Sequence, residues 1–354
     1  MPRQLNKTKH FQAAVHLREW INTLSPGEIL PVVSELTVRF GVSHGTAMRA
    51  LASLAAEGII VRPLGRKRYR IAERFEHISA RICVLRPDHP SFDLDSMEKS
   101  IYKAGLKRNW TFIQHCFRNL SELDFSRIMA KADAMILIPT AEIISEDLIK
   151  GLLKPARPVV VLLQHLRHPM INNVCINDFR VGELAAEALA RRGHKRILFL
   201  KTEPDETTMR ERFNGFRSVA ERLGLECGEE LYFDTHLRAF EPALETAYRA
   251  LSDRLDKGKP DFTALFSASL SGGLAPYRAL REHGLRVPED VAVLAYSGEA
   301  NLAPYLTPPL SSVEINSEEF GEFSVNLLDK ALKGSLKNAE QIEIQPHCSL
   351  RESM

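Results

Sequence analysis

Cationic side chains crowd the sequence just after the Pro63–Gly65 turn, where Arg66, Lys67 and Arg68 follow one another. Residues 1–75 contain 12 basic and 5 acidic residues, a formal charge of +7, whereas the remaining residues carry −5. Cations presented at a turn can neutralise the phosphates of a nucleic acid, which makes binding salt-dependent. Charge alone would equally fit a solvated basic tail, but the position of the run favours contact with a polyanion.

A second candidate surface begins at Ser43, which precedes a predicted helix over residues 44–57. A hydroxyl and free N–H groups at a helix N-terminus suit contacts with phosphates and base edges. On this helix Gly45 and Arg49 lie opposite an apolar stripe, so the outer face can approach a groove closely. The candidate DNA-binding residues are Ser34, Arg39, Ser43, His44, Gly45, Thr46, Arg49, Arg66, Lys67 and Arg68.

A winged helix-turn-helix would hold both surfaces. Two helices joined by a tight turn at Gly41 form the helix-turn-helix, with Ser34 and Ser43 as candidate N-caps. The alternative, a three-helix unit for protein contacts, leaves the cations of the wing unexplained. The predicted helices span 11–24, 33–40 and 44–57, and the predicted hairpin wing spans 59–71.

Motifs for enzymatic chemistry are absent from the sequence. It contains no Gly-x-Ser-x-Gly nucleophile motif, and Ser271-Gly272-Gly273 lacks the lysine that follows a phosphate-binding loop. His165 and His168 have metal-ligand types, but no third ligand is near in sequence and Pro169 follows directly. We therefore expect no catalytic residues, no metal and no cofactor.

The cysteines and the N-terminus indicate a reducing cytoplasm. Five widely spaced cysteines predict neither a disulfide framework nor a zinc site. Residues 1–11 lack the apolar core of a secretory signal. No apolar run reaches the roughly 18 residues that span a bilayer, so no membrane contact is expected.

Beyond a polar linker at 73–79, short apolar runs alternate with helical patterns. Continuous apolar strands separated by helices predict parallel sheets covered on both faces. The strands are too many for one doubly wound sheet, so we expect an α/β domain of two lobes. The domains are then 1–72 and 80–354, and the predicted strands are 81–85, 110–117, 134–138, 159–163, 174–176, 196–201, 230–233, 262–267 and 291–296.

Residues 15–72 resemble the GntR family of winged helices. Pro26-Gly27-Glu28-Ile29-Leu30-Pro31 is similar to that family's PGxxLP opening, and Phe40-Gly41-Val42-Ser43 to its GVS segment. Glu57-Gly58-Ile59-Ile60 and Gly65-Arg66 continue the match into the wing. The resemblance implies sequence-specific binding of double-stranded DNA. The family usually has Arg where this chain has Met48, which bears on the operator sequence rather than on DNA binding.

Residues from about 80 to the C-terminus resemble the effector domain of the LacI/GalR family, itself similar to periplasmic sugar-binding proteins. The matching segments keep their order and spacing along the chain. They are Asp178-x-x-x-Gly182, Gly193-His194-Lys195-Arg196-Ile197, Arg212-x-x-Gly215-Phe216, Val287-Pro288-Glu289-Asp290-Val291, Pro309-Leu310-Ser311-Ser312-Val313 and Leu350-Arg351-Glu352-Ser353.

This resemblance implies an effector held between two hinged lobes. We also expect a homodimer that reads an inverted repeat, because one head can touch only a short DNA site. Lobe 1 would comprise about 80–178 and 300–328, and lobe 2 about 179–299 and 329–354. The crossings would lie near Asn177–Phe179, Ser297–Leu302 and Leu327–Leu332. The implied effector-binding residues are Asp88, Phe92, Asp178, Arg212, Ser269 and Ser297.

A sugar is the expected effector, because a carboxylate and a guanidinium suit a polyol. Two carboxylates usual in the family are missing, since Ser269-Leu270 and Ser297 stand in their place. A less polar or anionic ligand therefore stays open. The expected function is a transcription regulator, a repressor controlled by this effector. The alternatives are a constitutive regulator with a vestigial pocket, or a small-molecule-binding protein that does not act on DNA.

Overall fold

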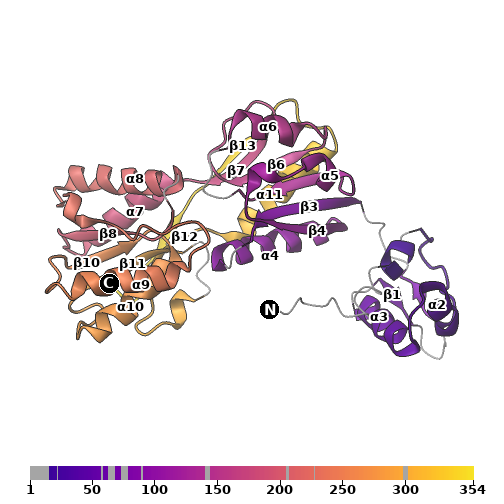
Figure 1. Ribbon diagram of the computed structural model, residues 1–354, viewed down its shortest axis with the longest axis horizontal. Helices are drawn as coiled ribbons and strands as arrows, with labels where there is room; N and C mark the ends of the chain where they lie inside the picture. Colours follow the sequence, from indigo (N-terminus) through magenta and orange to yellow (C-terminus); the bar gives the residue numbers. More distant parts are fainter. Residues whose placement is uncertain are drawn as a thin grey trace. The chain divides into compact units, whose positions relative to one another are not determined.

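The computed structural model describes residues 16–21, 23–56, 59–62, 68–72, 79–88, 91–139, 144–204, 207–226, 228–297 and 302–354. The chain divides into two compact units, residues 1–79 and 80–354, called here the head and the body (Figure 1). Residues 73–78 of the expected linker lie outside the described residues. None of the described helices is long and apolar enough to cross a membrane.

The head has the predicted helices and wing strands. Residues 16–21 are helical, α2 spans Val33–Phe40 and α3 spans His44–Ala56. Strand β1 (Ile60–Val61) pairs antiparallel with β2 (Arg70–Ile71). Their shared core consists of Leu17, Ile21, Leu30, Leu36, Leu51, Leu54, Ile60 and Ile71.

Of the two predicted helix caps, the one at Ser43 is present and the one at Ser34 is not. Ser43 caps α3, because its Oγ accepts a hydrogen bond from the N–H of Thr46 at 3.2 Å. The cap predicted at Ser34 is wrong, because α2 begins at Val33, so Ser34 lies in its first turn and Val32 is the N-cap. The N–H of Val32 donates to the Glu35 carboxylate at 3.2 Å, which satisfies that donor without a hydroxyl.

The body contains two six-stranded sheets, each with helices on both faces (Figure 1). The first sheet is parallel throughout, in the order β13-β7-β6-β5-β3-β4. Its strands are β3 (Ala80–Pro87), β4 (Trp110–Phe117), β5 (Ala134–Leu137), β6 (Val159–Leu163), β7 (Asn172–Ile176) and β13 (Gln341–Ile344). Its helices are α4 (Phe92–Leu106), α5 (Phe125–Met129), α6 (Glu146–Leu153) and α11 (Ser317–Leu332), with a short 3-10 turn at Leu120–Glu122.

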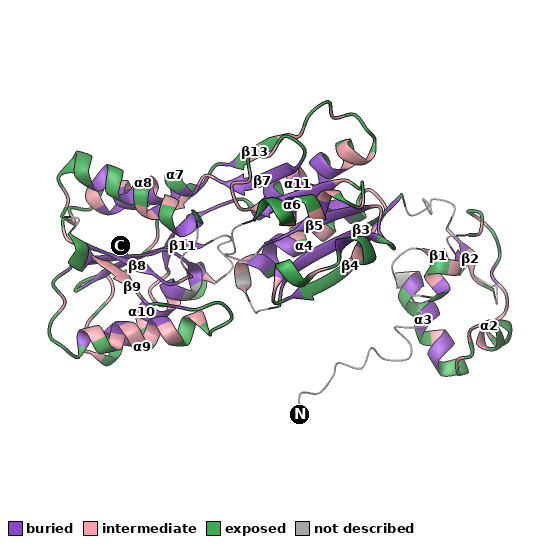
Figure 2. Cartoon of the chain, turned by 45° about the horizontal axis from the view of Figure 1, so that its top comes forward, coloured by how far each residue is buried: buried purple, intermediate pink, exposed green. Residues whose placement is uncertain are grey.

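The second sheet has the order β14-β12-β11-β10-β8-β9 and is parallel except for the edge strand β14. Its strands are β8 (Ile197–Lys201), β9 (Tyr232–Asp234), β10 (Ala264–Ser267), β11 (Ala292–Ser297), β12 (Ser311–Glu314) and β14 (His347–Ser349). Its helices are α7 (Asp178–Arg191), α8 (Thr207–Leu223), α9 (Ala243–Leu255) and α10 (Leu270–Glu282), with 3-10 turns at Glu229–Leu231 and Ala303–Tyr305. Figure 2 shows the central strands buried and the outer helix faces exposed, as parallel sheets covered by helices require, while the edge strands are partly exposed.

The lobe crossings differ in part from those expected. The first lies between β7 and α7, at Asn177, where it was predicted. The second lies between β12 and α11, after Glu314 rather than near Ser297–Leu302, because β12 pairs with β11 of the second sheet. The third lies between β13 and β14 rather than at Leu327–Leu332, because β13 pairs with β7. Lobe 1 is therefore the first sheet with its helices, including α11, and lobe 2 the second sheet with its helices.

Candidate functional site

The exposed surface of the head carries most of the described DNA-binding candidates. They are Ser34, Arg39, Ser43, His44, Gly45, Arg49 and Arg68. A side chain added at Gly45 would meet no atom within 4 Å, so the first turn of α3 has open space outside it. Arg66 and Lys67, the other predicted wing contacts, lie outside the described residues.

Thr46 differs from the other candidates on α3. It is 6% exposed, and its hydroxyl lies 2.9 Å from Ser43 Oγ. A buried hydroxyl that belongs to the helix cap is poorly placed to read a base edge. Thr46 is therefore better explained as part of the cap, while Ser43 keeps an exposed position beside it.

Two arginines of the head are held by local contacts. Arg49 Nε donates to the carbonyl of Gly45 at 3.2 Å, which keeps the side chain along the outer face of α3. The guanidinium of Arg39 lies 4.4 Å from the centre of the Trp20 ring, a cation–π contact. Both side chains remain exposed and can exchange these contacts for phosphate or base contacts.

A buried ion pair marks the first crossing of the body. Arg212 on α8 donates from Nε to Asp178 Oδ1 at 2.7 Å and from Nη1 to the carbonyl of Ala268 at 2.6 Å. Asp178 is 1% exposed and Arg212 is 6% exposed. The guanidinium also lies 3.7 Å from the centre of the Tyr296 ring. Asn177, not Asp178, caps α7, since its Oδ1 accepts from the N–H of Arg180 at 2.9 Å.

Tyr296 was missed by the sequence analysis. Burial raises the pKa of its phenol; Arg212 opposes this rise, while the carboxylates of Asp93 and Asp178 add to it. Its buried hydroxyl has no hydrogen bond of normal geometry within the described part of the chain. The influence of Asp93, in the first turn of α4, places lobe 1 close to this tyrosine of lobe 2.

Hydroxyls gather at the carboxyl ends of the strands of lobe 2. Ser269 caps α10, accepting from the N–H of Gly272 at 3.3 Å, and its Oγ lies 2.7 Å from Thr202 Oγ1. Ser297, the last residue of β11, is fully buried. In open α/β sheets this edge is where ligands bind. The predicted residues Ser269 and Ser297 thus lie at the expected edge, although Ser269 already has a structural role.

The predicted residues of lobe 1 lie after β3 and at the start of α4. Asp88 follows β3, is exposed, and lies 3.4 Å from Arg118 Nε. Phe92 is the first residue of α4, and its side chain lies outside the described part of the structure.

His165 is a second residue that the sequence analysis did not place in this site. Its Nε2 lies 3.4 Å from Asp178 Oδ2. Asp178 and then Cys175 raise its pKa to about 10. No local motif could signal this contact, since the two residues come from different lobes.

Comparison with known proteins assigns both units. Residues 11–67 match the model of the bacterial regulatory proteins of the gntR family, and residues 186–354 match that of the periplasmic binding protein-like domain. The chain therefore combines a segment that matches the gntR family with a segment that matches the periplasmic binding protein-like domain. Several curated relatives that match the chain are transcription regulators or repressors.

The curated relatives share only part of their length with this chain. The HTH-type transcriptional regulator CelR of Thermobifida fusca is 31% identical over 183 residues, which are 52% of each protein. The HTH-type transcriptional repressor PurR of Mannheimia succiniciproducens is 28% identical over 211 residues, 59% of this chain and 60% of the repressor. The chain thus spans about half the length of these relatives.

Two solved structures support the fold. A LacI family transcriptional regulator from Enterococcus faecium with bound ribose has a TM-score of 0.68 at 24% identity, and covers 77% of this chain and 98% of its own. A complex of the transcriptional regulator CelR with cellobiose has a TM-score of 0.67 at 21% identity, and covers 92% of this chain and all of its own. At these identities the likeness concerns the fold.

Proposed function

We propose that this protein is a DNA-binding transcription regulator, and a repressor, whose affinity for its operator is modulated by a small molecule bound between the two lobes of the body. The two domain matches support the pairing of a DNA-binding head with an effector domain. A homodimer and an inverted-repeat operator are part of the proposal, because one head covers only a short site.

The observation that carries the effector site is the buried hydroxyl of Tyr296 beside the pair of Arg212 and Asp178, because it interacts with Arg212 but has no hydrogen bond of normal geometry within the described residues. Buried polar groups are nearly always hydrogen-bonded, so an exception calls for an explanation. The explanation we propose is that a hydroxyl group of the ligand completes the hydrogen bonding of this phenol. The neighbouring hydroxyls of Ser269 and Ser297 also suit a polyol.

A sugar or sugar derivative is the proposed class of effector. Ribose and cellobiose are bound in the two similar structures, and the ribose operon repressor of Haemophilus influenzae is 26% identical over 197 residues. Thermal unfolding of the full chain with a panel of sugars, beginning with ribose and cellobiose, tests this class, because a ligand of the native state raises the melting temperature. A panel without effect would favour the vestigial pocket.

Tyr296→Phe tests the site itself. We expect affinity for the sugar identified by the panel to fall about tenfold, which corresponds to ~1.4 kcal/mol. The melting temperature without ligand should stay equal or rise, since an unpaired buried hydroxyl costs about 1–3 kcal/mol. Calorimetric titration and thermal unfolding measure the two effects. Equal affinity in the variant and the parent chain would place the effector elsewhere.

Gly45→Ala tests close approach of α3 to DNA. The added methyl group meets open space, so the helix should gain up to ~1 kcal/mol from the better propensity of alanine. Binding to an operator selected from random duplexes should weaken by about tenfold, roughly 1.4 kcal/mol, because a methyl group then separates helix and groove. Gel-shift titration measures this loss, and the number of chains per operator tests the homodimer. Unchanged operator binding would remove Gly45 from the interface.

A further inference from the structure

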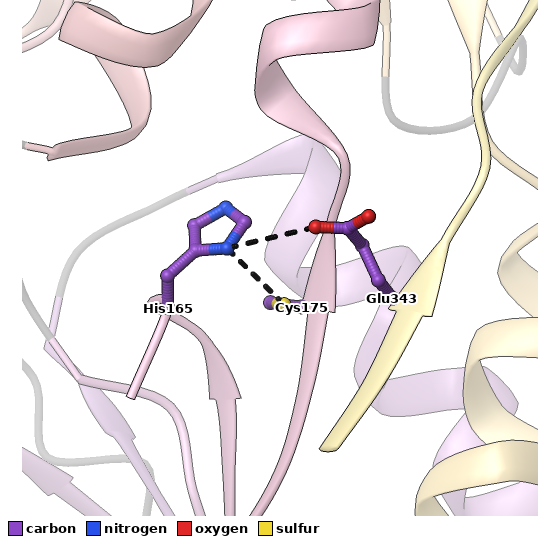
Figure 3. A group of neighbouring side chains, drawn as sticks. All are labelled: His165, Cys175 and Glu343. Carbon is purple, nitrogen blue, oxygen red and sulfur yellow. Dashed lines mark hydrogen bonds and ion pairs between the residues drawn. The ribbon is translucent and has the colours of Figure 1, made fainter. Parts of the chain in front are cut away.

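Three side chains with metal-binding atoms meet near the first and third crossings of the body. His165 follows β6, Cys175 lies on β7 and Glu343 lies on β13 (Figure 3). These strands are neighbours in the order β13-β7-β6, with Glu343 directly opposite Cys175. The sheet therefore brings the three residues together, although they are far apart in the sequence.

The three ligand atoms lie within 4.8 Å of one another, close to the separations of tetrahedral coordination. His165 Nδ1 lies 3.4 Å from Cys175 Sγ and 3.9 Å from Glu343 Oε1. Zinc bonds of about 2.3 Å to sulfur and about 2.0 Å to nitrogen or oxygen, at tetrahedral angles, separate the ligand atoms by about 3.3–3.6 Å. Glu343 is the most exposed of the three, with 44% of its side chain accessible, so its carboxylate can move the remaining few tenths of an ångström.

Hydrogen bonds and an unusual backbone conformation fix the loop that carries His165. Leu163 has φ of 67°, a left-handed conformation that is uncommon for a residue with a side chain. The buried amide of Asn173 donates to the carbonyls of Val161 at 2.9 Å and Gln164 at 2.8 Å, which ties the loop to β7. Strain held in place by surrounding contacts is typical of functional sites.

The other ring nitrogen of His165 lies near a carboxylate, although it has no hydrogen bond of normal geometry within the described residues. Its Nε2 lies 3.4 Å from the Asp178 carboxylate, which Arg212 holds in turn. A metal-binding histidine almost always donates its second N–H to a carboxylate, a carbonyl or water, which orients the ring. His168, paired with His165 in the sequence analysis, is not in this cluster, since its Nδ1 accepts from the N–H of Met170 at 3.2 Å.

We propose that His165 Nδ1, Cys175 Sγ and a Glu343 carboxylate oxygen bind a divalent transition-metal ion of the zinc class, with water as the fourth ligand. A soft thiolate combined with imidazole and carboxylate suits zinc or cobalt rather than magnesium or calcium. On binding, metal bonds to sulfur and to Nδ1 replace the thiol S–H bond of Cys175 and the Nδ1–H bond of the protonated His165 ring, and both protons pass to solvent. The ion would lie beside Asp178 and so adjoin the proposed effector site.

Cobalt titration of the full chain tests the proposal, after removal of metal with a chelator and under reducing conditions. We expect one Co²⁺ per chain and a thiolate-to-cobalt charge-transfer absorption. Cys175→Ser should abolish this absorption. Cys116→Ser is the matched control and should retain it, because Cys116 is an exposed cysteine outside the cluster.

Two further variants test the carboxylates. Glu343→Gln should weaken cobalt binding by at least tenfold, and Asp178→Asn by about 10–100-fold, as for other partners of metal-bound histidines. Circular dichroism of each variant checks that it folds. If Cys175→Ser fails to fold, Glu343→Gln still tests the site, because Glu343 is exposed. Absence of the charge-transfer band in the parent chain, or its persistence in Cys175→Ser, would overturn the proposal. In that case the cluster is an ion-pair and hydrogen-bond group only.

Discussion

Replacement of Arg212 with alanine is expected to lower the free energy of unfolding of the body by about 3–5 kcal/mol, because it leaves the carboxylate of Asp178 buried without its partner. Urea unfolding of the full chain, followed by circular dichroism, measures this loss. The sequence alone suggested a residue that acts on the effector without a structural role. The contacts of Arg212 with Asp178, Ala268 and Tyr296 show a structural role, which adds to the proposed effector role.

A double variant separates these roles. Arg212→Met with Asp178→Asn removes both charges, so most of the stability should return, as it often does when a buried ion pair is replaced. Effector binding should not return, since neither the guanidinium nor the carboxylate is present. The double variant should still bind the operator without effector, but no longer respond to the effector. A response that survives in the double variant would contradict the proposed site.

Gly182→Ala is expected to destabilise the body by about 1–3 kcal/mol or more, since it forces backbone atoms apart. A Cβ at position 182 on α7 would lie 1.9 Å from the carbonyl oxygen of Arg212 and 2.5 Å from the nitrogen of Phe216, both on α8. Backbone atoms cannot rotate away as a side chain can. The two helices must separate, and Arg212 must move with α8, so effector affinity should fall as well.

Gly151→Ala in α6 is the matched control for this change. There the added Cβ would meet only the ring of Phe125, at 3.3 Å, and that side chain can shift. Helix propensity alone would make either alanine stabilising by up to ~1 kcal/mol. Urea unfolding of both variants therefore tests whether backbone contact or helix propensity decides the sign of the stability change at Gly182. A stabilised Gly182→Ala chain would show that α7 and α8 are not in close backbone contact.

Much of the architecture could be predicted because it depends on local pattern. Apolar periodicity located α2 and α3, and Ser43 was correctly identified as the cap of α3. Most strands of the body were also found, since parallel strands buried on both faces give continuous apolar runs. The cap at Ser34 was wrong because the helix already begins at Val33, where the Glu35 carboxylate accepts from the N–H of the N-cap residue Val32.

The sequence by itself determined the two-unit plan and the helix-turn-helix, and it singled out Asp178 and Arg212 as candidate residues, because each is encoded in short segments of characteristic spacing. Their contact with each other came from the tertiary structure. Only the tertiary structure decided which lobe contains β12 and β13, because these short strands are assigned by their pairing, β12 with β11 and β13 with β7. It also placed Tyr296 beside Arg212 and His165 beside Glu343. Such contacts depend on strand order and register, which bring distant segments together and leave no periodic signal in the chain.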